Sequence, residues 1–154
     1  MGEASLADAG YYTDTHIDYD ICDWKGTFTG KDGVYSKEDF LNNPQAQENA
    51  LNKHKKIQWQ YFINHGYATD KYLGKTIDGI KITPSSMLGG AHLGGHGKVE
   101  EILRTNGKAD AHDAFNSSVK LYMRDFQDYD VTEWTGQRYR PDGRILSDEE
   151  LAQF

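Results

Sequence analysis

The chain has 154 residues, which fits a single globular domain of ordinary size. Hydrophobic residues make up 37% of it, and 3 Trp, 10 Tyr and 6 Phe suffice to build a core, which excludes a wholly disordered chain. A formal charge of −7 argues against a general nucleic-acid surface. The sequence has no run of about 18 apolar residues, the length that could span a membrane, and the first residues lack the pattern of a secretory signal peptide. Cys22 is the single cysteine, so an internal disulfide is excluded.

The first forty residues predict two short helices around a long loop. Residues 1–10 read as a short helix that ends at Gly10, because glycine readily takes the left-handed conformation that follows a helix. Residues 11–37 mix acidic and aromatic side chains without a sustained period, so we expect a long surface loop with room for a short strand. Ser36 and Asp39 have the spacing of a capping box before Phe40, with aspartate in place of the usual glutamate.

The middle of the chain predicts a long helix and a hairpin. Asn43 and Pro44 are a helix start, since asparagine caps well and proline loses nothing at the first helical position. Apolar residues at helical spacing extend this helix to about residue 65. The pair Asp78-Gly79 between short β-prone runs predicts a small hairpin over residues 76–82.

Further helices are expected after the hairpin. Thr83-Pro84 repeats the cap and proline, and the helix that follows meets Gly94-Gly95. Helical spacing resumes over residues 98–104 and again over residues 118–126. Residues 129–154 have no clear pattern. The predicted fold class is therefore mostly α, formally α+β, with one long central helix and a small β-hairpin.

Residues 88–99 are the most informative segment, with five glycines in twelve residues. Each glycine weakens a helix by up to about 1 kcal/mol relative to alanine, so close approach of a backbone or a ligand is the expected reason. The segment resembles the Ala-Tyr-Asn-Ala-Gly-Pro-Gly-x-Val element of lytic transglycosylases and goose-type lysozymes. It is closer still to the Ala-His-Leu-Gly-Gly element of lysozyme-like phage and secreted effector domains. The matching positions are Ala91, His92, Gly95, Gly97 and Val99, whereas Leu93 and His96 depart from the asparagine and the proline.

The resemblance continues elsewhere in the chain. Residues 1–12 look like the effector segment that follows a Tyr-Gln pair, and residues 24–26, 30–33, 39–44 and 47–48 are similar to its middle part. The resemblance covers about residues 1–130, which implies a lysozyme-like domain there and a C-terminal extension over residues 131–154. It also implies cleavage of the β-1,4 bond between N-acetylmuramic acid and N-acetylglucosamine in peptidoglycan.

Family members carry their catalytic glutamate on a helix that would precede Met1, so we expect the usual acid to be missing from this chain. Glu3 is then the best carboxylate for protonating a leaving oxygen, and the alternative for it is a helix-terminal charge. By resemblance and by aromatic stacking on sugars, the expected substrate-binding residues are His92, Gly94, Gly95, Tyr11 and Tyr12.

The resemblance implies an antibacterial effector or phage lysis protein. It would be secreted, or delivered to the periplasm of a target cell, with a cognate immunity protein as a possible partner. A non-catalytic module that binds glycan or an inhibitor is the alternative. A third hypothesis is a metal-dependent hydrolase that uses His92, His96 and the aspartates, among them Asp18, Asp20 and Asp23. The spacing matches neither a zinc-protease motif nor a complete calcium loop, so we expect no metal and no cofactor.

Overall fold

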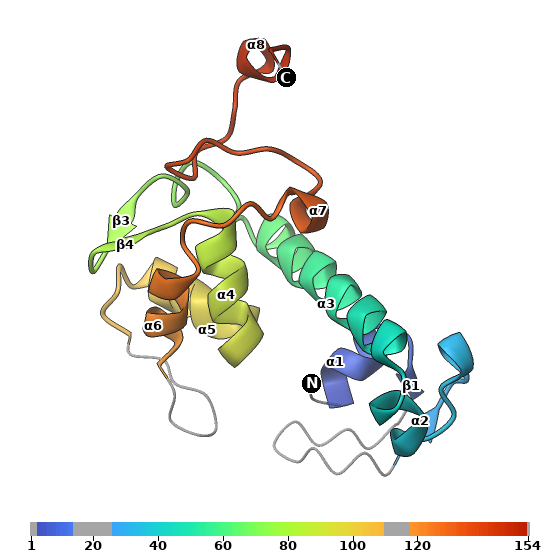
Figure 1. Cartoon of the computed structure of the whole chain (residues 1–154). Helices are drawn as coiled ribbons and strands as arrows, with labels where there is room; N and C mark the ends of the chain where they lie inside the picture. Colours follow the sequence, from blue (N-terminus) through green and yellow to red (C-terminus); the bar gives the residue numbers. More distant parts are fainter. Residues whose placement is uncertain (1–2, 14–25, 110–117, 154) are drawn as a thin grey trace. The chain divides into compact units, whose positions relative to one another are not determined.

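A computed structural model describes residues 3–13, 26–109 and 118–153 of the chain (Figure 1). The chain divides into two compact units, residues 1–57 and 58–154, and the division lies within one long helix, α3 (Pro44–Asn64). The described part is mostly helical with two small two-stranded sheets, which confirms the predicted α+β class. Among the described residues, no helix combines the length and apolarity needed to cross a membrane.

The first unit is built on a short helix and a strand pair. Helix α1 (Glu3–Asp8) ends as predicted before Gly10, which has a φ of 87°. Strands β1 (Tyr12–Thr13) and β2 (Thr27–Phe28) are antiparallel, with Tyr12 opposite Phe28. A 3₁₀ turn, η1 (Lys31–Gly33), and helix α2 (Lys37–Leu41) follow. The core of this unit consists of Leu6, Ala9, Tyr11, Tyr12, Val34, Phe40, Ala46 and Ala50.

In the described parts of the expected loop, residues 11–13 and 26–37, several side chains are buried, contrary to the expectation of a surface loop. Tyr11, Tyr12 and Val34 are almost fully buried, because their apolar side chains pack on α1 and α2. This burial was hard to predict from the sequence because acidic residues lie between the buried positions. The aspartates at positions 18, 20 and 23, and Cys22, lie outside the described residues.

Both predicted helix caps near residue 40 are formed. The Ser36 hydroxyl accepts the backbone N–H of Asp39 at 3.1 Å, while the Asp39 carboxylate accepts the N–H of Tyr35 at 3.0 Å rather than closing a full capping box. The Asn43 side-chain oxygen accepts the N–H of Ala46 at 3.0 Å, and Pro44 opens α3 as expected.

The second unit begins with the predicted hairpin. Strands β3 (Thr76–Ile77) and β4 (Ile80–Lys81) are antiparallel, and the turn places both Asp78 and Gly79 at positive φ, 50° and 75°. Positive φ at both central residues is the conformation that an Asp-Gly pair favours in a two-residue hairpin.

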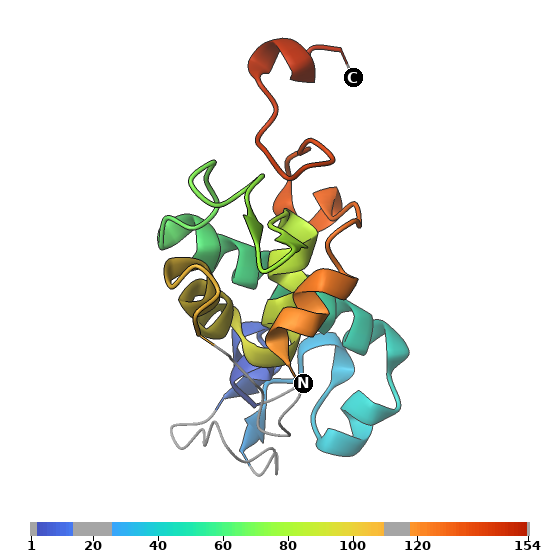
Figure 2. The same cartoon turned by 90° about the vertical axis from the view of Figure 1, so that its left-hand side faces the viewer.

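Three helices that follow the hairpin in the chain pack together. Helix α4 (Pro84–Gly94) starts with a complete capping box between Thr83 and Ser86. Helices α5 (His96–Arg104) and α6 (Val119–Asp125) both contact α4, and the two views in Figures 1 and 2 show the three side by side. Residues 84–91 are buried without interruption, so α4 is the central helix of this unit.

The C-terminal segment joins the core of the second unit. Val131 is buried, and Trp134, Tyr139 and Ile145 pack against the same cluster as the residues of α4 to α6. The segment contains the short helices α7 (Thr132–Thr135) and α8 (Asp148–Leu151) and a β-bridge between Tyr139 and Ile145. The expected boundary at residue 130 thus falls within a packed unit, and the division into a domain over residues 1–130 and an extension over residues 131–154 stays a prediction.

Candidate functional site

Glu3 lies in the first turn of α1 and is only 5% exposed. The Tyr12 hydroxyl donates a hydrogen bond to its Oε1 at 2.6 Å. The backbone N–H of Gly26 in turn donates to the Tyr12 oxygen, and the Tyr12 ring meets Phe28 edge to face at 5.3 Å between centroids. The carboxyl group is therefore shielded from solvent and oriented by the Tyr12 hydroxyl.

Tyr11 is completely buried, and three side chains contact it. Its hydroxyl donates to Asp32, its ring meets Phe40 at 5.9 Å, and the Lys31 ammonium lies 4.7 Å from the ring centre. Burial, with the hydrogen bond to Asp32, raises the pKa of Tyr11 to about 12, and the same bond lowers the pKa of Asp32. The predicted stacking of Tyr11 and Tyr12 on a sugar would require both rings to leave the core.

The glycine-rich run serves helix packing at three of its positions. A Cβ on Gly90 or Gly94 would lie within 3.0 Å of a side chain on α6, and a Cβ on Gly89 would lie 2.6 Å from Phe126, the residue that directly follows α6. Gly95, with a φ of 81°, separates α4 from α5, and its N–H donates to the carbonyl of Ala91 at 2.8 Å. The room predicted for a ligand at Gly94 is thus filled by Val119 and Lys98. His92 is exposed on the same helix.

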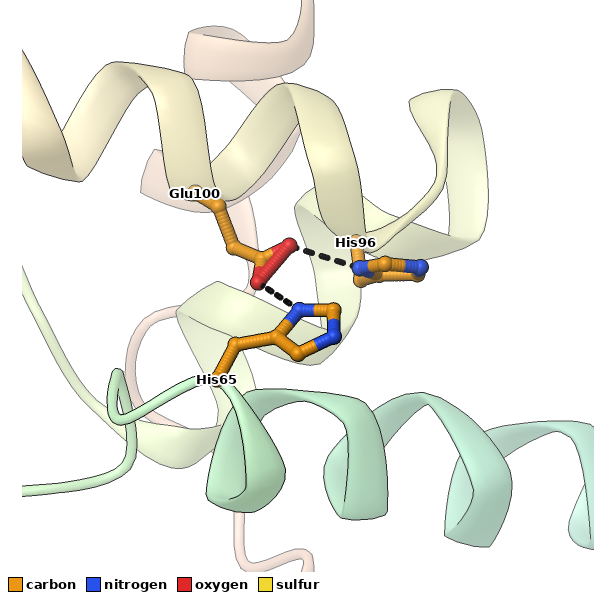
Figure 3. A group of neighbouring side chains, drawn as sticks. All are labelled: His65, His96 and Glu100. Atoms are coloured by element: carbon orange, nitrogen blue, oxygen red, sulfur yellow. Dashed lines mark hydrogen bonds and ion pairs between the residues drawn. The ribbon is translucent and has the colours of Figure 1, made fainter.

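The second unit brings two histidines and a glutamate together, as Figure 3 shows. Glu100 lies on α5 and is 5% exposed, while His96 is one turn earlier on the same helix and His65 directly follows α3. His96 Nδ1 lies 2.6 Å from Glu100 Oε2, and His65 Nδ1 hydrogen-bonds to the other carboxylate oxygen, Oε1. We call these three residues the His-Glu-His cluster.

Aromatic rings hold His96 in place. Tyr61 stacks on the His96 ring with centroids 4.3 Å apart and an angle of 18° between the planes. Phe62 meets the same ring edge to face at 6.4 Å, and the His65 ring lies 5.2 Å away. His96 is therefore positioned by α3 and α5 together, and its partners are His65 and Glu100, neither of which the third hypothesis included.

Sequence reasoning missed His65 and Glu100 as site residues. The spacing of His96 and Glu100, four residues apart on a predicted helix, was a readable signal that both could bind one ligand. His65 gave no such signal, because it lies 35 residues from Glu100 in the sequence and only the fold joins them.

A groove of about 420 Å³ lies elsewhere in the second unit, between the start of α4 and the C-terminal segment. Thr83 and Gln127 both line the groove, and the Thr83 hydroxyl donates a hydrogen bond to the Gln127 backbone carbonyl at 2.7 Å. Lys81, Asp128 and Arg138 add charged groups to its lining. The predicted site residues Glu3, His92, Gly94, Gly95, Tyr11 and Tyr12 do not line this groove.

Comparisons of the chain with protein-family models, with curated proteins and with solved structures found no match.

Proposed function

We propose that this chain cleaves the glycan strands of peptidoglycan, as a muramidase or lytic transglycosylase of lysozyme-like fold. The observation that carries the proposal is the buried, hydrogen-bonded carboxyl group of Glu3 within a segment that resembles the effector family. The substrate is the β-1,4 bond between N-acetylmuramic acid and N-acetylglucosamine, as the resemblance implies.

In this reaction Glu3 gives its proton to the glycosidic oxygen as the bond from that oxygen to the anomeric carbon breaks. Water, or a hydroxyl of the substrate itself, then attacks the anomeric carbon, and the proton it loses restores the acid. The Tyr12 hydroxyl, bonded to Oε1, orients the carboxyl group so that the other oxygen can face the substrate. His92 and Gly95 are proposed to contact the glycan, whereas Gly94 is left out because Val119 and Lys98 fill the space beside it.

One observation favours a second candidate function, a non-catalytic module that binds glycan strands or an inhibitory protein. Glu3 is only 5% exposed and one of its oxygens already accepts a hydrogen bond from Tyr12, which is also what is expected of a purely structural glutamate. In that case the chain would hold peptidoglycan without cleaving it.

The setting proposed for the activity is antibacterial. A chain that degrades peptidoglycan would act where that polymer is, in the periplasm of a target cell, after secretion or phage delivery. A cognate immunity protein would protect the producing cell by covering the glycan-binding surface.

The test is release of soluble muropeptides from purified peptidoglycan by the full chain, by Glu3→Gln and by the control Glu38→Gln, with products identified by mass spectrometry. Glu38 is an exposed glutamate on α2, so its substitution should leave release unchanged. We expect Glu3→Gln to lower release by at least about 100-fold, the usual contribution of a general acid.

Release that is equal in all three proteins would remove Glu3 from the mechanism. No release from a folded wild-type chain that still sediments with peptidoglycan would establish the binding module instead. The mass of the products separates the two enzyme classes, because hydrolysis adds water and a lytic transglycosylase leaves an anhydro end.

A further inference from the structure

We propose that the His-Glu-His cluster is a binding site for a single zinc ion in the second unit. His65 and His96 would coordinate through their imidazole nitrogens and Glu100 through its carboxylate. The proposal is independent of peptidoglycan cleavage, since it concerns different residues and a different chemistry.

The donor atoms are close enough to share one ion. One ligand atom from each of the three residues lies within 4.8 Å of the other two. Zinc–nitrogen bonds of about 2.0–2.1 Å in tetrahedral geometry place neighbouring ligand atoms about 3.4 Å apart. His96 Nδ1 and Glu100 Oε2 lie 2.6 Å apart, so these two donors would have to separate by about 0.8 Å to share the ion.

The donor set is one that zinc favours. Two imidazoles and one carboxylate are the three protein ligands of many zinc sites that keep a fourth position open for water. A spacing of four residues on a helix places His96 and Glu100 on one face, as in known helical zinc motifs, and the third ligand comes from another element.

Charge and burial support a cation at this place. The Glu100 side chain is 7% exposed, and a buried carboxylate is costly unless it is paired. In the structure both of its oxygens are taken by imidazole Nδ1 atoms, whose protons a zinc ion would replace on binding.

The surroundings provide both rigidity and access. The stacked Tyr61 ring and the edge of Phe62 restrict rotation of His96, which reduces the entropy lost when it binds an ion. The His65 side chain is 44% exposed, compared with 26% for His96, so an ion can enter from the solvent on the His65 side. The fourth coordination position is expected on that open side.

The experiment measures zinc binding by the full chain after treatment with a chelator. The chain is titrated with zinc chloride alone in a calorimeter, and bound metal is counted by elemental analysis after gel filtration. His65→Gln is the main variant, because His65 is exposed and its loss should not disturb folding. His92→Gln is its control, an exposed histidine of the same unit outside the cluster.

Glu100→Gln and Glu101→Gln form a second matched pair, one buried in the cluster and one exposed beside it. We expect one zinc per wild-type chain, binding at least about tenfold weaker in His65→Gln and in Glu100→Gln, and no change in the two controls. Circular dichroism checks that each variant is folded.

The proposal is overturned if the wild-type chain binds no stoichiometric zinc, or if His65→Gln binds it as tightly as wild type. Equal loss in His65→Gln and His92→Gln would also overturn it, because the ion would then lie outside the cluster. If Glu100→Gln fails to fold, the comparison of His65→Gln with His92→Gln decides alone.

Discussion

Two buried charged side chains of this protein have opposite surroundings. Each carboxylate oxygen of Glu100 is hydrogen-bonded to an imidazole. Lys55 is only 6% exposed, and its ammonium group has no hydrogen-bond partner among the described residues. Burial lowers the pKa of Lys55 from 10.5 to about 8. Of these two residues, Lys55 is therefore the one whose burial as a charged group lowers the free energy of unfolding.

We expect Lys55→Met to stabilise the protein. The unfolded chain holds the Lys55 proton up to about pH 10.5 and the folded chain only to about pH 8, so the wild type gains stability as the pH rises between these values. The penalty is complete below pH 8 and reaches at most about 3 kcal/mol. Lys55→Met should raise the free energy of unfolding at pH 7 by up to that amount.

Urea unfolding at pH 7 and at pH 10 measures this effect, with Lys56→Met as the control at an exposed neighbour. The gain from Lys55→Met should shrink at pH 10, and Lys56→Met should change little at either pH. A gain that is the same at both pH values would show that packing, and not the charge, is responsible.

At the scale of elements, the glycine-rich run has two kinds of position. On α4, a Cβ at Gly90 would lie 2.6 Å from Met123 Cγ and 2.9 Å from Val99 Cγ2, so α6 and α5 can approach only because that side chain is missing. On α5, a Cβ at Gly97 would have nothing within 4 Å. The same residue type is therefore needed for packing on one helix and not on the next.

This contrast predicts opposite effects of one substitution. Gly90→Ala should lower the free energy of unfolding by about 1–3 kcal/mol, the usual cost of overpacking a core. Gly97→Ala should raise it by up to about 1 kcal/mol, because alanine favours a helix more than glycine does. Thermal and urea unfolding of the two variants compare them directly. A stabilising Gly90→Ala would contradict the close packing of α4 against α6.

At the scale of the whole chain, the C-terminal segment decides where the second unit ends. Val131, Trp134, Tyr139 and Ile145 all contact its core, and the Tyr139 ring meets Trp59 edge to face at 5.8 Å. Residue Gly143 lies so close to Ile82 that a Cβ there would be 2.4 Å from the Ile82 carbonyl oxygen. The segment therefore covers apolar surface that would otherwise meet water.

We expect a chain that ends at residue 130 to be less stable than the full chain by at least about 3 kcal/mol, since two or more large apolar side chains lose their contacts. A chain that ends at residue 146 loses α8 but keeps those contacts, so its stability should be close to that of the full chain. Urea unfolding monitored by tryptophan fluorescence compares the three. Equal stability of the shortest chain would instead support a domain boundary at residue 130.

Helix and turn positions were predictable from sequence because their signals are local. The caps at Ser36, Asn43 and Thr83 involve a backbone N–H three residues away, and the turn at Asp78-Gly79 depends on the φ values of those two residues. The burial of Tyr11 and Tyr12 was not predictable in the same way. It depends on how α1 packs against the 3₁₀ turn and α2, which no short pattern records.

The candidate sites divide along the same line. The amino-acid sequence by itself determined the mostly helical class, the element starts and the resemblance that singles out Glu3 and His92. Only the tertiary structure decided that Glu3 pairs with Tyr12 and that the missing side chain of Gly90 lets α6 approach α4. It alone also brings His65 to Glu100, 35 residues away in the sequence, and to His96. The physical reason is range: a cap or a turn is stabilised by neighbours along the chain, whereas a packed core or a ligand cluster depends on where the chain returns.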